Sequence, residues 1–136
     1  MIHFAIRHCP KKSEPLENVI KRIKKSGLYS YGNRRADNGF VFVIQTINTT
    51  PVQYELGYGY KVSSSEKQAG GYKWHDVYNF KHIPDRESPI YYFEKPKFID
   101  NDDFREWFSS SEVTRQGMAE VPDEHIKLLI DMFQNS

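Results

Sequence analysis

The spacing of hydrophobic residues along the chain predicts most of its strands. Polar and apolar residues alternate over 1–8, which is typical of a half-buried strand. Residues 40–44 form a continuous apolar run, FVFVI, and such a run is typical of a central strand. The clearest alternation covers 52–62, and Gly57 and Gly59 fall on one face of that predicted strand. Glycines at such positions indicate a bend or the close approach of another element.

Two further strands are predicted in the second half of the chain. One begins with the alternating aromatic residues from Tyr72 onward and ends at 84–86, and the next covers 88–94. Between the strands lie stretches rich in Gly, Ser, Thr, Asn or Pro, which favour turns and loops. The predicted loops are 28–35, 48–51, 63–71 and the polar stretch 114–122.

Three segments are predicted as helices, and the first and the third have the spacing of amphipathic helices. The first begins near Pro15, a residue favoured at helix starts. Its apolar stripe consists of Leu16, Val19, Ile20 and Ile23. The second is short and covers 102–109, with Asp102 or Asp103 as the expected N-cap. The third begins at Pro122. Its stripe consists of Ile126, Leu129, Ile130 and Phe133.

The order of these elements predicts an α+β fold. The order is β-α-β-β-β-β-α-α, and consecutive strands with short connections favour an antiparallel or mixed sheet over a doubly wound parallel one. Short strands of this kind often curl into a small barrel. We therefore expect a barrel of five to six strands flanked by two to three helices. With 136 residues and no repeat or linker in the pattern, the chain 1–136 is expected to form one domain.

Composition indicates a cellular compartment and an uneven distribution of charge along the chain. Cys9 is the only cysteine, so an internal disulfide is impossible and a reducing, cytoplasmic location is expected. No apolar run has the length of a membrane span. The net charge is only +1, but the first 35 residues are rich in Lys and Arg and the last 40 in Asp and Glu. A basic end can meet phosphate groups, although solvated helix faces produce the same asymmetry.

Motifs for catalysis or for a cofactor do not occur in the chain. No Gly precedes a Lys, as a phosphate-binding P-loop requires, and no Gly-x-Ser-x-Gly nucleophile elbow is present. No Asp or Glu is followed two residues later by Lys, an arrangement with which many nucleases hold Mg²⁺ and orient water. Cys9 and the histidines lack the spacing of a zinc site. The acids of 100–103 could bind a cation, but helix capping explains them more simply. We expect no metal, no cofactor and no catalytic residue in this chain.

Several stretches are similar to the EVE domain, a member of the PUA-like superfamily. Residues 93–98 (FEKPKF) resemble its proline-bearing strand, and residues 115–129 (RQGMAEVPDEHIKLL) resemble its polar loop and the start of its terminal helix. Residues 73–84 (KWHDVYNFKHIP) are similar to the preceding strand of EVE domains and of the related YTH domains. Residues 26–30 (SGLYS) resemble the YTH loop that supplies one wall of a base-binding cage. The resemblance implies a PUA-like barrel that binds nucleic acid and recognises a modified base.

The resemblance also implies which residues meet the nucleic acid. Tyr29 stands where a cage aromatic is found, and Tyr72 or Trp74 lies near the second wall. A Tyr in place of the first YTH cage Trp, and Gln116 in place of an acid, make a modified cytosine at least as good a candidate as N6-methyladenine. The implied base-binding residues are Tyr29, Ser30, Tyr31, Tyr72 and Trp74. The implied backbone-binding residues are Lys21, Lys24, Lys25, Asn33, Arg34, Arg35 and Arg115.

Three functions are compatible with these residues. The first is a reader of a modified base in DNA or RNA, serving in a modification-dependent restriction system whose nuclease or NTPase lies on another domain or chain. Flipping a base costs a few kcal/mol, and aromatic walls return roughly 1–3 kcal/mol per stacked base. The second is a small nuclease or base hydrolase, in which Asp76 or Glu55 would carry the acid–base chemistry. The third is a module that binds a peptide in an aromatic groove.

Overall fold

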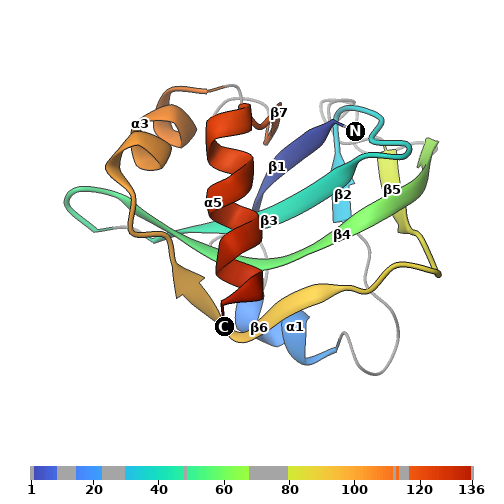
Figure 1. The fold of residues 1–136 in the computed structure, drawn as a ribbon, viewed down its shortest axis with the longest axis horizontal. Coiled ribbons are helices and arrows are strands. Elements are labelled where there is room, and N and C mark those ends of the chain that lie inside the picture. Colours follow the sequence, from blue (N-terminus) through green and yellow to red (C-terminus); the bar gives the residue numbers. More distant parts are fainter. Residues whose placement is uncertain are drawn as a thin grey trace.

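The computed structural model describes residues 2–8, 15–22, 30–47, 49–67, 80–111, 113 and 117–135. These residues form a mixed sheet curled into a half-barrel, with three helices packed against it (Figure 1). The α+β class expected from the sequence is confirmed. The described elements are β1 (His3–His8), α1 (Leu16–Lys21), β2 (Ser30–Gly32), β3 (Phe40–Ile47), β4 (Gln53–Lys67), β5 (Phe80–Pro84), β6 (Tyr91–Phe98), α3 (Asp102–Ser110), β7 (Met118–Glu120) and α5 (Asp123–Gln134).

The sheet is organised around the long strand β4. Six strands follow one hydrogen-bonded path in the order β2-β5-β4-β3-β1-β7, and β6 pairs with β4 off this path. One edge of β4 pairs with β3, whereas the other edge pairs first with β6 and then with β5. β1 and β3 are parallel, and the other described strand pairs are antiparallel. The sheet is therefore mixed, as its short connections predicted.

The two ends of the strand path approach each other. A Cβ atom added to Gly32 in β2 would lie 2.5 Å from Sδ of Met118 in β7, so only a residue without a side chain fits there. The guanidinium carbon of Arg34, which follows β2, lies 5.1 Å from the centre of the Phe4 ring in β1. The sheet thus curls around the face that carries Phe4 and Met118.

Two hydrophobic cores lie on opposite faces of the sheet. In β3, Val41 and Val43 belong to one core and Phe42 and Ile44 to the other, because successive side chains of a strand point to opposite faces. The α1 core, inside the curl, consists of Phe4, Ile6, Leu16, Val19, Ile20, Ala36, Val41, Val43, Tyr58, Tyr60, Val62 and Met118. The α5 core, against α3 and α5, consists of Ala5, Phe42, Ile44, Tyr54, Leu56, Ile99, Phe104, Phe108, Val113, Ala119, Val121 and Leu129.

A bulge at Gly57 moves β4 from one core to the other. Residues 43–44 of β3 pair with Tyr58 and Leu56, so Gly57 is the extra residue of β4 at this point. Leu56 consequently faces the α5 core, whereas Tyr58 faces the α1 core. Without the bulge the two side chains, two positions apart, would point to the same face. One alternating stretch of sequence therefore contributes side chains to both cores.

The two glycines of β4 allow close approaches on different faces. A side chain at Gly57 would overlap Leu16 of α1, whose Cγ lies 2.8 Å from the Cβ position. A side chain at Gly59 would meet Cε1 of Phe40 at 2.8 Å, on the face of the α5 core. The predicted bend and close approach are both present, but the prediction that the two glycines share a face was wrong, because the bulge separates them.

Several strands differ in extent from the pattern that predicted them. β4 continues through residues 63–67, predicted as a flexible loop, because they pair with β5. β2 and β7 lie within segments predicted as loops, 28–35 and 114–122, because three-residue strands carry too little periodicity. β6 covers 91–98 rather than 88–94. These additions come from strand pairing, which is not visible in local sequence.

The helices begin close to where they were predicted. The N-cap of α3 is Asn101, whose Oδ1 accepts a hydrogen bond of 2.9 Å from the N–H of Phe104, so Asp102 and Asp103 are not the cap. α5 begins directly after Pro122, as predicted. The end of the α1 stripe and residues 72–79 of the predicted strand lie outside the described residues. No described helix has the length and apolar character needed to cross a membrane.

Candidate nucleic-acid interface

Segment 30–35 contains most of the described residues that were implied in nucleic-acid binding. Here β2 pairs with β5, and β5 pairs with β4, so three strands lie side by side. In this register Ser30 is opposite His82, and His82 is opposite Ser65. All three side chains are buried. The next row, on the opposite face of the strands, consists of Tyr31, Lys81 and Glu66. One row therefore faces the α1 core and the other faces outward.

Hydrogen bonds inside the curl anchor the start of β2. The N–H of Ser30 donates to Oη of Tyr60 at 2.8 Å, and the two hydroxyl oxygens are 2.7 Å apart. The hydroxyl of Tyr60 donates to the carbonyl oxygen of His82 at 2.8 Å. Oγ of Ser30 is 3.2 Å from Nδ1 of His82. Because these groups are buried, each bond left unmade would cost about 1–3 kcal/mol, so β2 is held firmly on β5.

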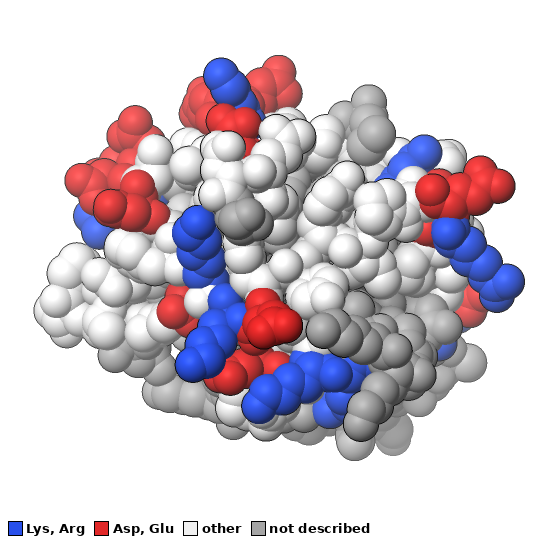
Figure 2. Space-filling model, turned by 60° about the horizontal axis from the view of Figure 1, so that its bottom comes forward, with Lys and Arg blue, Asp and Glu red and all other residues white. Residues whose placement is uncertain are grey.

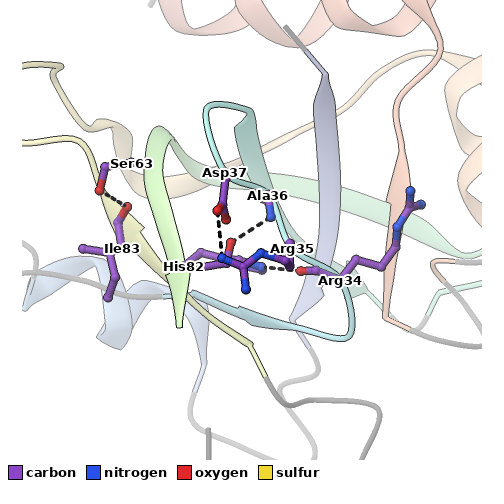
Figure 3. A network of polar contacts seen from close by, with 8 residues as sticks. Arg34, Arg35, Ala36, Asp37, Ser63, His82 and Ile83 are labelled. Carbon is purple, nitrogen blue, oxygen red and sulfur yellow. Dashed lines mark hydrogen bonds and ion pairs between the residues drawn. The ribbon is translucent and has the colours of Figure 1, made fainter. Parts of the chain in front are cut away.

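His82 connects this network to the segment that follows β2 (Figure 3). Its Nε2 lies 2.9 Å from the carbonyl oxygen of Arg34, and a carbonyl only accepts, so Nε2 carries a hydrogen. The side chain is 0 % exposed. Burial lowers the pKa of His82 below its ordinary value, more than the Arg34 carbonyl and the Asp37 charge raise it. His82 is therefore neutral near pH 7, and its Nδ1 is an acceptor that faces the Ser30 hydroxyl.

The charged end of the segment is partly compensated. The guanidinium of Arg35 donates to Asp37 at 2.8 Å and lies 5.5 Å from the centre of the Phe80 ring. The Arg35 hydrogen bond holds the pKa of the Asp37 carboxyl below its ordinary value, against a small opposing effect of desolvation. The N–H of Ala36 donates to Oγ of Ser65 at 2.8 Å and ties the same segment to β4 (Figure 3).

Three exposed residues of this segment form what we call the Tyr31 edge: Tyr31, Arg34 and Arg35. Tyr31 is 49 % exposed, and both arginines are exposed. Asn33 is half-buried between them. The hydrogen-bonding groups of Ser30 point inward to Tyr60 and His82 instead, so Ser30 positions the edge. An exposed ring and two exposed guanidinium groups on one short segment can stack on a base and attract phosphate.

The other implied residues are distributed differently. Lys21 lies on α1, exposed and 3.9 Å from Glu17, so it is separate in sequence and element from the Tyr31 edge. Six residues lie outside the described part of the chain: Tyr29, Tyr72, Trp74, Lys24, Lys25 and Arg115. Tyr29 directly precedes β2, and 72–79 directly precede β5. The predicted cage walls are therefore continuous in sequence with two paired strands.

Surface charge is mixed on the face that carries α1 and β6. Figure 2 shows Lys and Arg side chains interleaved with Asp and Glu side chains along the lower part of that face. Acidic side chains gather at the upper left, toward α3. Charge segregation along the sequence therefore does not become a uniformly basic face in this view.

The acid–base alternative has one described candidate. Oε1 of Glu55 accepts a hydrogen bond of 2.8 Å from Nε2 of Gln45, and Oε1 of Gln45 lies 3.3 Å from the N–H of Leu16. Glu55 thus belongs to a chain of contacts that anchors α1. Asp76, the other candidate, lies outside the described residues. Among the described residues, no group of three or more His, Cys, Asp or Glu side chains could hold a metal ion.

Sequence reasoning missed the residues that support the Tyr31 edge. Tyr60 was assigned to a strand, but its pattern did not show that its hydroxyl meets Ser30, which lies 30 positions away. His82 was treated as one of several scattered histidines. A buried His opposite a Ser on neighbouring strands becomes apparent only when the strand register is known.

Comparisons with known proteins add no relative. No family model, no curated protein and no solved structure matches this chain. The EVE and PUA-like resemblance accordingly stays a prediction that rests on the residues quoted for it.

Proposed function

We propose that this chain is a nucleic-acid-binding module of the PUA-like, EVE type, which recognises a modified base by flipping it into an aromatic cage. The observation that carries the proposal is the Tyr31 edge. It presents an exposed aromatic ring on β2, a strand fixed by buried hydrogen bonds, and two exposed arginines in the segment that follows β2. The strand begins at Ser30, the last residue of 26–30, the segment that resembles a cage loop.

Each part of the edge has a role in this mechanism. Arg34 and Arg35 attract the phosphates, a contact that weakens with salt. Tyr31 stacks on a base or on the neighbouring step of the strand. Tyr29 and Tyr72 or Trp74 supply the cage walls, and a methyl group on the flipped base adds about 0.8 kcal/mol of apolar burial. Lys21, Lys24, Lys25 and Arg115 extend the contact with the backbone.

The fixed position of β2 favours recognition. A cage must keep its walls at a ring-sized spacing, and a wall on a mobile loop would lose entropy on binding. The Ser30, Tyr60 and His82 bonds hold the residue that follows Tyr29 in place before the ligand arrives. This preorganisation lowers the cost of accepting a flipped base.

The partners follow from this role. The ligand is DNA or RNA that carries a modified base, a methylated cytosine or N6-methyladenine being the first candidates. Nuclease or NTPase activity belongs to another domain or chain of a modification-dependent restriction system. The lone Cys9 fits a cytoplasmic location for such a system.

Fluorescence anisotropy with short labelled oligonucleotides tests the proposal. DNA and RNA probes each carry one modified base, and the unmodified sequence serves as the reference. We expect one modification to bind about tenfold more tightly than the unmodified probe, a difference of about 1.4 kcal/mol. The variant Tyr29→Ala should abolish that preference. Arg34→Ala should weaken binding to all probes alike and reduce the salt slope by about one.

A matched aromatic control makes the result specific. Tyr91 is 42 % exposed but lies on β6, away from the Tyr31 edge in the strand order. Tyr31→Ala should weaken oligonucleotide binding, whereas Tyr91→Ala should leave it unchanged. Equal affinity for modified and plain probes, together with unchanged binding in Tyr29→Ala, would overturn the proposal. Metal-dependent cleavage of the probe that Glu55→Gln abolishes would favour the small enzyme instead.

A further inference from the structure

One face of α3 carries two acids and a Trp at helical spacing. Asp103, Glu106, Trp107 and Ser110 occupy positions i, i+3, i+4 and i+7, so they lie along one side of the helix. Together with the start of α5 this side lines an open hollow of about 560 Å³, which we call the Trp107 groove. Its lining includes Asp103, Glu106, Trp107, Ser110, Glu124 and His125. Sites that enclose ligands typically have volumes of about 300–1,000 Å³.

Two rings contribute to the wall of the groove. The ring centres of Trp107 and His125 are 5.5 Å apart, and Phe104 packs edge-on against His125, also at 5.5 Å. His125 is only 4 % exposed. Its Nε2 is 3.7 Å from Oε1 of Glu124, which exceeds hydrogen-bond distance. Among the described residues no hydrogen bond to the His125 ring is present. This nearly buried polar ring therefore lines the groove without a hydrogen-bond partner among those residues.

The acids of the groove are not required by the helix that carries most of them. Asn101 provides the N-cap of α3, and Asp102 pairs with Arg105 at 2.9 Å. Within the described part of the chain, the carboxylates of Asp103 and Glu106 form no hydrogen bond or ion pair. Negative charge in the first turn favours a helix, but Glu106 lies in the second turn, where that effect has faded. The acids are therefore available to a ligand.

The chemistry of the groove selects its occupant. The described acids do not form a cluster that could hold a metal ion, and carboxylates repel phosphate. An organic cation is excluded by neither argument, because it needs no cluster of metal ligands and is attracted by carboxylates. Arginine fits best, because its planar guanidinium stacks on a Trp face and bonds carboxylates with two N–H groups. We propose that the Trp107 groove binds a basic segment of a partner protein, with an arginine over Trp107 and with Glu106 and Glu124 as its carboxylate partners.

This role is separate from nucleic-acid binding. The groove lies on α3 and α5, against the α5 core, whereas the Tyr31 edge lies on β2 and the segment that follows it, over the α1 core. A partner with a basic segment can therefore dock while the edge contacts phosphate. The two surfaces carry opposite charge, so each rejects the ligand of the other.

The test uses the full chain and a labelled Gly-Ser peptide that carries several arginines. The control peptide has citrulline at each arginine, which keeps the shape and removes the charge. We expect the arginine peptide to bind at least tenfold more tightly than the citrulline peptide at low salt. The double variant Glu106→Gln, Glu124→Gln should weaken the arginine peptide about tenfold. Asp123→Asn removes one charge beside Glu124 without lining the groove and should change affinity less than twofold.

The outcomes separate the proposal from its alternatives. Equal binding of the two peptides, or equal affinity in the double variant and in Asp123→Asn, would overturn it. Tighter binding of a free polyamine than of the arginine peptide would assign the groove to a small molecule. Salt-sensitive self-association in sedimentation experiments, abolished by the double variant, would make the occupant a second copy of this chain. In each of the last two cases a partner protein is no longer the ligand.

Discussion

The Tyr31 edge and the Trp107 groove combine similar residues with opposite charge. Each combines an aromatic ring with charged side chains, arginines at the edge and carboxylates in the groove. Their supports also differ. Buried hydrogen bonds of Ser30, Tyr60 and His82 hold the edge in position, whereas the packed rings of Phe104 and Phe108 hold the groove in position. One curled sheet thus carries two surfaces, one held in place by hydrogen bonds and the other by apolar packing.

The difference matters for how each surface responds to change. A hydrogen-bonded support has directional requirements, so the loss of one hydroxyl leaves partners unsatisfied. An apolar support has a volume requirement, so the loss of a ring leaves a cavity. Loss of a buried ring, loss of a buried hydroxyl and loss of a surface charge should therefore have different effects on stability.

The largest effect is expected at the apolar support of the groove. Phe104 is fully buried and its ring packs against Trp107, Phe108 and His125. Phe104→Ala should lower the free energy of unfolding by about 3–5 kcal/mol, because transfer and cavity terms add. Urea denaturation measures this change. Phe98→Ala, at a ring that is largely exposed, should cost less than about 1 kcal/mol. A small loss at Phe104 would mean that the groove does not depend on the α5 core.

A matched pair of tyrosines tests the polar support of the edge. The rings of Tyr58 and Tyr60 are parallel within 3° and 6.3 Å apart, and both are buried. Tyr60→Phe leaves the Ser30 N–H and the His82 carbonyl without their partner and should cost about 1–3 kcal/mol. Within the described residues the Tyr58 hydroxyl makes no hydrogen bond, so Tyr58→Phe should cost less than about 0.5 kcal/mol. Equal losses in urea denaturation would show that the hydroxyl network is not the support.

The same network predicts a dependence of stability on pH. Burial lowers the pKa of His82 in the folded protein, so the unfolded chain binds a proton at higher pH than the folded one does. Stability attributable to His82 is therefore present above the ordinary pKa of 6.5 and is lost as pH falls below it. Thermal unfolding at several pH values should show this loss in the wild type and a flatter profile in His82→Gln. Parallel profiles for the two proteins would contradict the prediction.

The smallest effect on stability is expected at the surface of the edge. Arg35 and Asp37 are 2.8 Å apart but largely exposed, and such pairs contribute about 0–1 kcal/mol. Asp37→Asn should therefore change the unfolding free energy by less than about 1 kcal/mol at neutral pH. It should strengthen oligonucleotide binding about twofold at low salt, because the Arg35 charge is no longer compensated. Weaker binding in Asp37→Asn would show that Asp37 positions Arg35.

The candidate site was only partly predictable from sequence. The exposed residues Tyr31, Arg34 and Arg35 were named because they follow a loop that resembles a cage loop. Their support was missed because His82 lies 52 positions from Ser30, and no local pattern joins the two. The groove had a readable signal in the spacing of Asp103, Glu106 and Trp107. From the sequence, only the acids of 100–103 were interpreted, as helix capping, a role that Asn101 performs.

By itself the sequence determined the local elements of this protein. Alternation placed β1 and the first part of β4 in strands, and a continuous apolar run placed β3. Helical spacing located α1 and α5, and a cluster of acids indicated the start of α3. These features depend on side-chain periodicity, which is a property of neighbouring residues. Tertiary structure alone decided the short strands β2 and β7 and the bulge at Gly57, which divides one alternating stretch between two cores. The burial of His82 was decided in the same way. Those features depend on which distant backbones pair and which side chains share a space, so they exist only once the sheet has curled.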